Sequence, residues 1–181
     1  GIIEARRGVG NFVRKTMDAG ATGLERMDNP LYKSLEEPVD QVELNVVPGI
    51  STRYTEQIFR RKMPVVLAVH RFYEREGTVQ AYCFSHIATD FPELNQVDLN
   101  DRDAFLAFLE REIYQAAHSR KCGLRVVRMT ENLKEKSIKN ESGLFQMILE
   151  TILDKNGDVV AVNKFYIPIE KAVVRVFSSN A

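Results

Sequence analysis

Apolar residues recur at every second position over several stretches of the chain, which is the period of a β-strand with one buried face. Val42 to Val47 shows this alternation and stops at Pro48-Gly49. Two predicted hairpins follow further along the chain, each with a glycine in its connector. Their strands, together with two single strands, occupy residues 65–74, 78–87, 124–129, 144–154, 158–167 and 171–177.

The register of the first hairpin depends on the length of the loop around Gly77. A three-residue loop with Gly77 left-handed pairs Val69 with Cys83, whereas a two-residue loop would mix polar and apolar residues on both faces. We therefore expect the longer loop, with Arg71 and Ser85 as the only clearly polar members of one apolar face. The apolar members of this predicted face are Val65, Leu67, Val69, Tyr73, Val79, Ala81, Cys83 and Ile87.

The second hairpin is predicted by the same argument. A three-residue loop ending at Gly157 pairs Leu153 with Val159, and a bulge at the glycine closes the turn. In this register Glu150 points away from the apolar face. The apolar face then contains Phe145, Met147, Leu149, Leu153, Val159, Ala161, Phe165 and Ile167.

A helical period of apolar residues predicts one long helix between Asn100 and about His118. Asn100 is a favourable N-cap, and Asp101 and Asp103 suit the positive end of the helix dipole. A short helix capped by Ser51 or Thr52 is predicted before Pro64, and the polar residues 130–142 are expected to form a loop or strand end.

Together these elements predict an α+β fold, with an antiparallel sheet, one long helix packed on a face, a short helix and a C-terminal β-meander. Glycines and two proline turns interrupt residues 1–40, which we expect to be a weakly structured N-terminal arm. Residues 41–181 are expected to form a single α+β domain.

Composition excludes several classes of protein. The 181 residues carry 25 Lys+Arg and 25 Asp+Glu, so the formal net charge is zero, unlike a dedicated nucleic-acid-binding domain. No apolar run approaches the roughly 20 residues that cross a bilayer. The two cysteines are too few for a disulfide framework, and two buried free thiols are favoured over one bridge.

The balanced total hides opposed blocks of charge. Residues 53–75 hold 6 basic and 2 acidic side chains, 90–112 hold 2 and 7, and 120–139 hold 7 and 2. The basic blocks could meet an anionic partner if they share a face, although separate solvated surfaces are favoured. The candidate patch contains Arg60, Arg61, Lys62, Lys134, Lys136 and Lys139.

A second candidate surface lies on the other face of the first hairpin, where histidines and aromatic residues alternate with the apolar face. In the expected register His70 faces Tyr82, and His86 is about 13 Å away, too far for one zinc ion. A face partly covered by the arm or a helix is favoured over a binding surface. The candidate binding residues are His70, Phe72, Tyr82, Phe84 and His86.

The sequence contains no complete catalytic or cofactor motif. Gly8-Val9-Gly10 is a fragment of a dinucleotide fingerprint and follows no strand. His118 and Cys122 are four residues apart, but the helix is expected to end between them and no third partner is near. We therefore predict no catalytic residues, no metal and no cofactor, and we favour a protein that is not an enzyme.

The order of elements over Phe105–Phe177 resembles the PsbP-like superfamily of small α/β/α sandwiches. The similar stretch is an amphipathic helix, the strand beginning Leu124-Arg125-Val126-Val127, and the meander Leu144–Phe177. The resemblance implies an exported or organelle-lumenal accessory protein without catalytic activity, and it assigns no functional residue here.

The leading functional hypothesis is a non-enzymatic accessory module that binds a protein partner, with no specific nucleic acid as partner. The alternative is a small-ligand-binding domain, or an unrecognised hydrolase, that uses the histidine and aromatic face. An exported location is slightly favoured if Gly1 marks a trimmed signal segment, and a cytoplasmic one otherwise.

Overall fold

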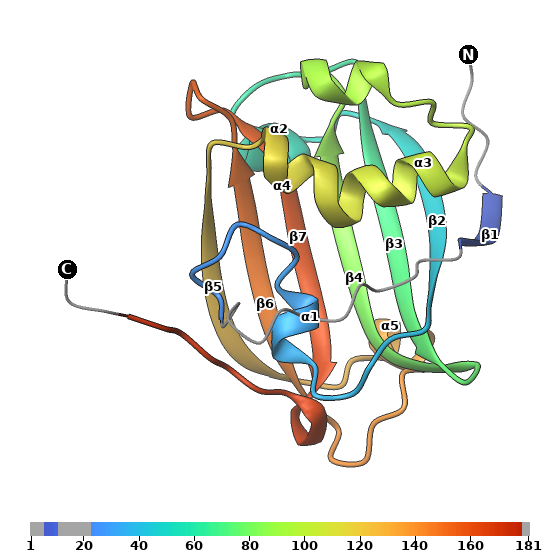
Figure 1. The fold of residues 1–181 in the computed structure, drawn as a ribbon. Helices are drawn as coiled ribbons and strands as arrows, with labels where there is room; N and C mark the ends of the chain where they lie inside the picture. Colours follow the sequence, from blue (N-terminus) through green and yellow to red (C-terminus); the bar gives the residue numbers. More distant parts are fainter. Residues whose placement is uncertain (1–5, 11–22, 179–181) are drawn as a thin grey trace.

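The structure, a computed structural model, describes residues 6–10 and 23–178. Within these residues seven strands form one sheet in the order β1-β2-β3-β4-β7-β6-β5, and all neighbouring strands are antiparallel (Figure 1). The strands are β1 (Arg6–Gly10), β2 (Gln41–Ile50), β3 (Val65–Arg75), β4 (Thr78–Ala88), β5 (Ser119–Arg128), β6 (Leu144–Leu153) and β7 (Val159–Pro168).

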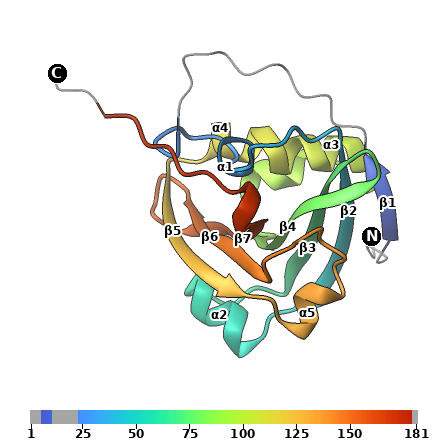
Figure 2. The same ribbon diagram turned by 90° about the horizontal axis from the view of Figure 1, so that it is seen from below.

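Helices cover both faces of the sheet (Figure 2). We name the face under α1, α3 and α4 the inner face, and the face that carries α2 and α5 the outer face. The helices are α1 (Leu31–Ser34), α2 (Arg53–Phe59), α3 (Arg102–Ala107), α4 (Ile113–Ala116) and α5 (Glu131–Lys134). The α+β class and the antiparallel sheet predicted from the sequence are confirmed.

The main core lies between the inner face and the helices. Apolar side chains of β3 such as Leu67 and Val69 pack with Phe105, Phe108 and Ile113 of the helical layer. On the outer face, Phe59 of α2 lies in a smaller core, as expected for a short helix capped by Thr52. A third cluster forms under α5, within the stretch that was expected to be a loop.

The long helix differs from its prediction. Residues 102–107 form α3, Phe108–Glu112 form a π-helical turn, and α4 ends at Ala116, so His118 lies outside the helix. A π-helical turn accommodates an extra residue and rotates the side chains that follow it. The turn places Glu110 in the interior, at 2% exposure.

Both hairpin registers differ from those predicted. At the first hairpin, Glu76 and Gly77 both have positive φ and form a two-residue turn, and a bulge follows at Tyr73/Glu74. His70 is therefore opposite Phe84 rather than Tyr82. The pairing of β3 with β4 is shifted by two residues from the predicted register. Because side chains alternate along a strand, an even shift leaves most members of the predicted apolar face on one side of the sheet. The exceptions are Val79, which lies in the outer-face cluster, and Val65, which is exposed.

In the second hairpin the pairing is shifted by one residue, so the side chains of β6 point to the opposite face from the one predicted. Leu153 pairs with Val159 as predicted, but a bulge then places Ile152 opposite Ala161 and Ile148 opposite Phe165. Because side chains alternate along a strand, a shift of one residue turns half the hairpin over. Glu150 consequently faces the inner side, contrary to the prediction.

The expected closing strand and the expected arm both differ from the structure in part. Residues 172–178 follow a 3₁₀ turn and are not part of the sheet; only Ala172 forms an isolated bridge, with Leu35. In the expected arm, Arg6–Gly10 form β1 and Leu31, Leu35 and Val39 are buried in the main core, while residues 1–5 and 11–22 lie outside the described residues. The domain boundary at residue 41 stays a prediction.

Candidate functional site

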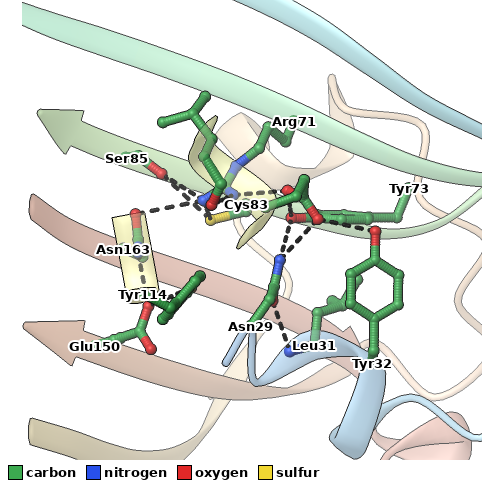
Figure 3. Close-up of polar contacts among 12 residues, drawn as sticks. Asn29, Leu31, Tyr32, Arg71, Tyr73, Cys83, Ser85, Tyr114, Glu150 and Asn163 are labelled. Atoms are coloured by element: carbon green, nitrogen blue, oxygen red, sulfur yellow. Dashed lines mark hydrogen bonds and ion pairs between the residues drawn. The ribbon is translucent and has the colours of Figure 1, made fainter. Parts of the chain in front are cut away.

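Polar side chains gather in the middle of the inner face, beneath the helices (Figure 3). They come from five strands, the π-helical turn, α4 and the segment around α1. We name this group the buried polar cluster. It contains Asn29, Tyr32, Arg71, Tyr73, Cys83, Ser85, Glu110, Tyr114, Arg120, Glu150 and Asn163.

The first ion pair of the cluster joins β3 to the π-helical turn. Arg71 Nη1 lies 2.7 Å from Glu110 Oε1, and the two side chains are 1% and 0% exposed. Arg71 Nη2 donates to Ser85 Oγ at 2.9 Å and to Asn163 Oδ1 at 3.3 Å. Arg71 Nε is buried and has no partner among the described residues, so one charged donor stays open.

Glu110 also holds groups from the segment around α1. Its Oε2 accepts hydrogen bonds from Asn29 Nδ2 and from Tyr32 OH, both at 2.8 Å, and its Oε1 accepts one from Tyr73 OH at 2.9 Å. Asn29 Oδ1 also accepts from the Leu31 amide at 2.9 Å. The carboxylate is therefore shared between the sheet and the chain segment that covers it.

A second ion pair lies beside the first. Arg120 Nη1 is 2.9 Å from Glu150 Oε1, and Glu150 Oε2 accepts from Tyr114 OH at 2.9 Å and from Asn163 Nδ2 at 2.7 Å. Because Asn163 also accepts from Arg71, its amide joins the two ion pairs into one network.

Burial shifts the titration of these groups. It raises the pKa of Glu150, against the opposing effects of Asn163 and Arg120. Burial alone would lower the pKa of Arg71, but the neighbouring Cys83, Tyr73 and Glu110 outweigh it and the pKa is raised well above its usual value. Burial also raises the pKa of the Cys83 thiol to about 11, so this sulfur is protonated at neutral pH and is a poor nucleophile.

The segment Leu24–Leu35 lies over the cluster and is held by Arg120. The Arg120 guanidinium donates to the Leu24 and Asp28 carbonyl oxygens at 2.6 Å each, and to the Arg26 carbonyl at 2.5 Å. The same residue therefore contacts both the cluster and its cover.

The structure brings the histidine and aromatic residues together on the outer face. His70 Nδ1 lies 2.6 Å from Tyr82 OH, and the rings of His70 and Phe84 and of Phe84 and His86 are 4.9 and 4.8 Å apart. Burial lowers the pKa of both histidines. Phe72 lies 5.2 Å from Tyr82 in the same row. Whether this row binds a ligand stays a prediction.

The candidate basic patch is divided between the two outer-face helices. Arg61 binds Asp90 through two contacts of 2.7 Å, so it joins the first basic block to the acidic block. The other cations lie next to α2 (Arg60, Lys62) and in or after α5 (Lys134, Lys136, Lys139), towards opposite ends of the sheet (Figure 1). Its role as a partner site stays a prediction.

The structure also bears on the two cysteines, on metal binding and on membrane-spanning helices. Both cysteines are free; Cys83 is buried, whereas Cys122 is exposed on β5, so the expectation of two buried thiols is wrong for Cys122. The helix ends at Ala116, before His118, and not between His118 and Cys122 as expected. Among the described residues no group of three or more His, Cys, Asp or Glu could hold a metal ion. None of the helices described here is long and apolar enough to cross a membrane.

Sequence reasoning missed the buried polar cluster, although one signal for it was present. Arg71 and Ser85 were the polar exceptions on an otherwise apolar face, and a charged residue on a buried face requires a partner. Glu150 was hidden by the bulge in the second hairpin, and Glu110 by the π-helical turn. Asn163 alternates with Ala161 and Phe165 of the predicted apolar face, so it was a further polar exception that the sequence offered.

No protein-family model and no curated protein matches the sequence. Solved structures do match. The effector-binding domain of the trehalose repressor TreR from Bacillus subtilis has a TM-score of 0.60 at 6% identity, covering 75% of this chain and 94% of that one. The ligand-binding domain of a regulator assigned to the GntR family from Bordetella bronchiseptica has 0.58 at 10%, covering 80% and 97%. YydK from B. subtilis, described as a transcriptional regulator, has 0.58 at 16%, covering 94% and 72%.

The chain therefore has the fold of the ligand-binding domains of GntR-family transcriptional regulators. This finding corrects the resemblance to PsbP-like proteins and the accessory-module hypothesis built on it. The order of elements along the chain did not fix their order in the sheet: β7 lies between β4 and β6, and residues 172–178 add no closing strand to the predicted meander.

Proposed function

We propose that this protein is a small-ligand-binding domain and that the buried polar cluster is its binding site. The observation that supports this proposal most strongly is a pair of linked ion pairs in the middle of the core, Arg71–Glu110 and Arg120–Glu150. Buried ion pairs are costly to desolvate, and packed apolar residues often stabilise a core as well or better. Recognition of a ligand would explain why four charged side chains lie in the middle of the core.

The ligand class follows from what the cluster offers. The Glu110 and Glu150 carboxylates accept hydrogen bonds, and Arg71 Nε, which has no partner among the described residues, is free to donate one to a ligand. A small polar molecule with several hydroxyl or amine donors and one acceptor or anionic group would match both. On entry its donors would replace Asn29 and Tyr32 on Glu110, so that the covering segment moves.

The sequence-level alternative places the ligand on the outer face instead. His70 and Arg71 are neighbours on β3 and point to opposite faces, as do Phe84 and Ser85 on β4. Phe84 and Ser85 therefore give a matched pair of variants, because they are adjacent on one strand and differ in the face they test. On β3 the inner-face partner of His70 in the experiment is Tyr73, which donates to Glu110.

The experiment is a thermal-shift screen of the purified chain with hexoses, hexose phosphates, amino acids and dicarboxylates, followed by calorimetric titration of each hit. We expect a hit to bind the His70→Ala and Phe84→Ala variants about as tightly as the wild type. The Ser85→Ala and Tyr73→Phe variants should bind at least about tenfold more weakly, which is 1.4 kcal/mol.

Reversed results, with binding lost in the outer-face variants and kept in the cluster variants, would refute this site and favour the outer face. Circular dichroism of every variant separates loss of binding from loss of folding. Ile50→Ala is the control for a substitution away from both faces' clusters, because Ile50 is 81% exposed.

The similar structures also support a wider role. We propose that the domain senses its ligand for a transcriptional regulator; the similar B. subtilis TreR domain is the effector-binding domain of a repressor. In this role the domain itself does not read DNA. Gel-shift assays of this chain alone with duplex DNA at low salt should then show no binding, and salt-sensitive binding would contradict the proposal.

A further inference from the structure

Between α2 and α5, the outer face is built from three rows of side chains that cross the sheet. Residues directly opposite each other on neighbouring strands point to the same face, so the register defines each row. From β3 to β5 the first row is Phe72, Tyr82, Tyr166, Met147 and Arg125, the second is His70, Phe84, Lys164, Leu149 and Gly123, and the third is Ala68, His86, Val162, Thr151 and Lys121. Every row thus has at least one aromatic ring on β3 or β4 and one cation on β7 or β5.

The rings on β3 and β4 form a partly exposed layer. The ring centroid of Phe84 lies 4.9 Å from that of His70 and 4.8 Å from that of His86, and Tyr54 of α2 continues the layer 5.6 Å from His86. The three strand residues are half-buried, whereas inner-face neighbours such as Arg71 are fully buried. Burial lowers the pKa of both histidines, so their rings are uncharged at neutral pH. The layer therefore offers planar surfaces on which another ring can stack.

The cations on β7 and β5 lie beside this layer. Lys121 and Arg125 are exposed, and Lys164 is half-buried with its Nζ 5.7 Å from the Tyr54 ring centroid. None of the three cations forms an ion pair with a residue in the described part of the chain. The three rows contain no acidic residue from β3 to β5, and their extension onto β2 adds only Glu43, which is buried. Positive charge on this half of the face is therefore available to a partner.

Further basic residues flank the rows at both ends. Residues 53–62, in and after α2, hold 4 basic and 1 acidic side chains, and residues 131–139, in and after α5, hold 3 and 2. Arg61 is occupied by Asp90, whereas Lys136 Nζ lies 5.6 Å from the Tyr82 ring centroid. Since α2 and α5 lie towards opposite ends of the strands (Figure 1), the candidate basic patch extends the cations of the rows in both directions.

We propose that this face binds a single-stranded nucleic acid without reading its sequence. The bases would stack on the rings of β3 and β4, and the phosphates would follow the cations of β7 and β5, so that the bound strand runs parallel to the strands of the sheet. Successive rows are about 7 Å apart along a strand, which is comparable with the spacing of phosphates in an extended nucleic acid. Aromatic side chains on an open sheet, next to a line of cations, are a general means of binding single strands.

Other partners use only part of this surface. A duplex keeps its bases stacked and paired, so only its phosphates could contact the face. An acidic peptide would likewise engage the cations and leave most of the rings unused, and a small molecule is usually bound in a more enclosed site. The zero net charge predicted no specific nucleic-acid partner, and stacking that is independent of sequence agrees with that prediction.

Fluorescence anisotropy with a labelled single strand of about 12 thymidine nucleotides tests the proposal. We expect binding at low salt that weakens as the salt concentration rises, because phosphate contacts release counterions. Phe84→Leu keeps an apolar side chain but removes the ring, and it should weaken binding at least about fivefold through the loss of stacking. Circular dichroism confirms that the variant is folded. An undetectable affinity at low salt, or an unchanged affinity in Phe84→Leu, would overturn the proposal.

Two arginines of β5 form a matched pair for the phosphate contacts. Arg125 and Arg128 are both exposed and, being three positions apart on the strand, point to opposite faces. Arg125→Gln should reduce the slope of log affinity against log salt by about 0.7, the value of one phosphate contact on a single strand. Arg128→Gln should leave the slope unchanged. The same slope in both variants and the wild type would place the phosphates elsewhere and contradict the assignment.

Two further probes test the class of partner. A duplex of the same length should not bind, and a polyglutamate peptide should bind at least about tenfold more weakly than the single strand, because it supplies charge without bases. Equal binding of the duplex would exclude stacking, and equal binding of polyglutamate would replace the nucleic acid by an acidic protein. None of these measurements involves the buried polar cluster, so their outcome is separate from the test of the proposed binding site.

Discussion

At the scale of single residues, Arg71 is the central member of the buried polar cluster. It lies between Glu110, Ser85 and Asn163, and its guanidinium is closed off from water. Removing one partner of a buried ion pair leaves the other charge unpaired, which typically costs about 3–5 kcal/mol. We expect Arg71→Ala to lower the free energy of unfolding by that amount.

Urea unfolding followed by circular dichroism measures this change. The control is His70→Ala on the neighbouring, half-buried position, where about 1 kcal/mol is expected. Equal costs at Arg71 and His70 would show that the network around Arg71 contributes little to the fold.

Glu150 provides a prediction on pH. Its pKa in the folded protein is raised by burial, so the folded state binds this proton more tightly than the unfolded state does. The stability contributed by protonated Glu150 is present below the unfolded pKa of about 4.3 and is lost as pH rises through the folded pKa. The stability of wild type relative to Glu150→Gln should therefore fall over that interval.

Thermal unfolding of both proteins from about pH 4 to pH 7 measures the difference. A difference that stays constant over the whole range would mean that Arg120 and Asn163 keep the pKa of Glu150 at its ordinary value.

At the scale of elements, the strands could be predicted from alternation, whereas their registers could not. Alternation reports which residues share a face within one strand, but a bulge changes the partner strand by one residue without altering either pattern. At the first hairpin the two-residue turn and the bulge together shift the pairing by two residues, so Arg71 and Ser85 lie on the predicted face. At the second, one bulge turned Glu150 inward.

The same limit explains what was missed in the helical layer. The apolar period predicts one helix between Asn100 and about His118 but does not reveal the π-helical turn that buries Glu110. Only part of the site could therefore be predicted from the sequence. Its residues on β3 and β4 were polar exceptions on an apolar face, whereas the charged groups that pair with them gave no such signal.

Turn geometry gives a prediction at this scale. Gly157 has φ of +83°, whereas Gly49 has ordinary backbone angles and room for a Cβ, its nearest neighbour being 4.0 Å away. Gly157→Ala should destabilise the fold by at least about 1 kcal/mol, and Gly49→Ala should be near neutral. Chemical unfolding of the two variants compares them directly, and an equal effect would contradict the role of the glycine in the β6–β7 turn.

At the scale of the whole molecule, the basic and acidic blocks that sum to zero net charge contribute side chains to the same buried site. Arg71 comes from the first basic block, Glu110 from the acidic block and Arg120 from the second basic block, so all three blocks contribute to the buried polar cluster. The segment Leu24–Leu35 then joins this cluster to the residues that follow the sheet, through contacts with Val173, Arg175 and Phe177.

This connection predicts a change in the covering segment. Tyr32→Phe removes one hydrogen bond to Glu110 and should speed amide hydrogen exchange in residues 24–35 by about 2- to 10-fold, the effect of roughly 0.5–1.5 kcal/mol. Exchange in β3 should be unchanged. Mass spectrometry of the exchanged peptides measures both, and uniform acceleration would indicate global destabilisation instead.

Binding of the ligand at the buried polar cluster is the central claim. The most direct measurement is a crystal structure of this chain with a ligand identified by the thermal-shift screen. We expect ligand atoms within hydrogen-bond distance of Arg71 and Glu110, with Asn29 and Tyr32 displaced from the carboxylate. A ligand seated between His70 and His86 on the outer face, over an unchanged cluster, would contradict it.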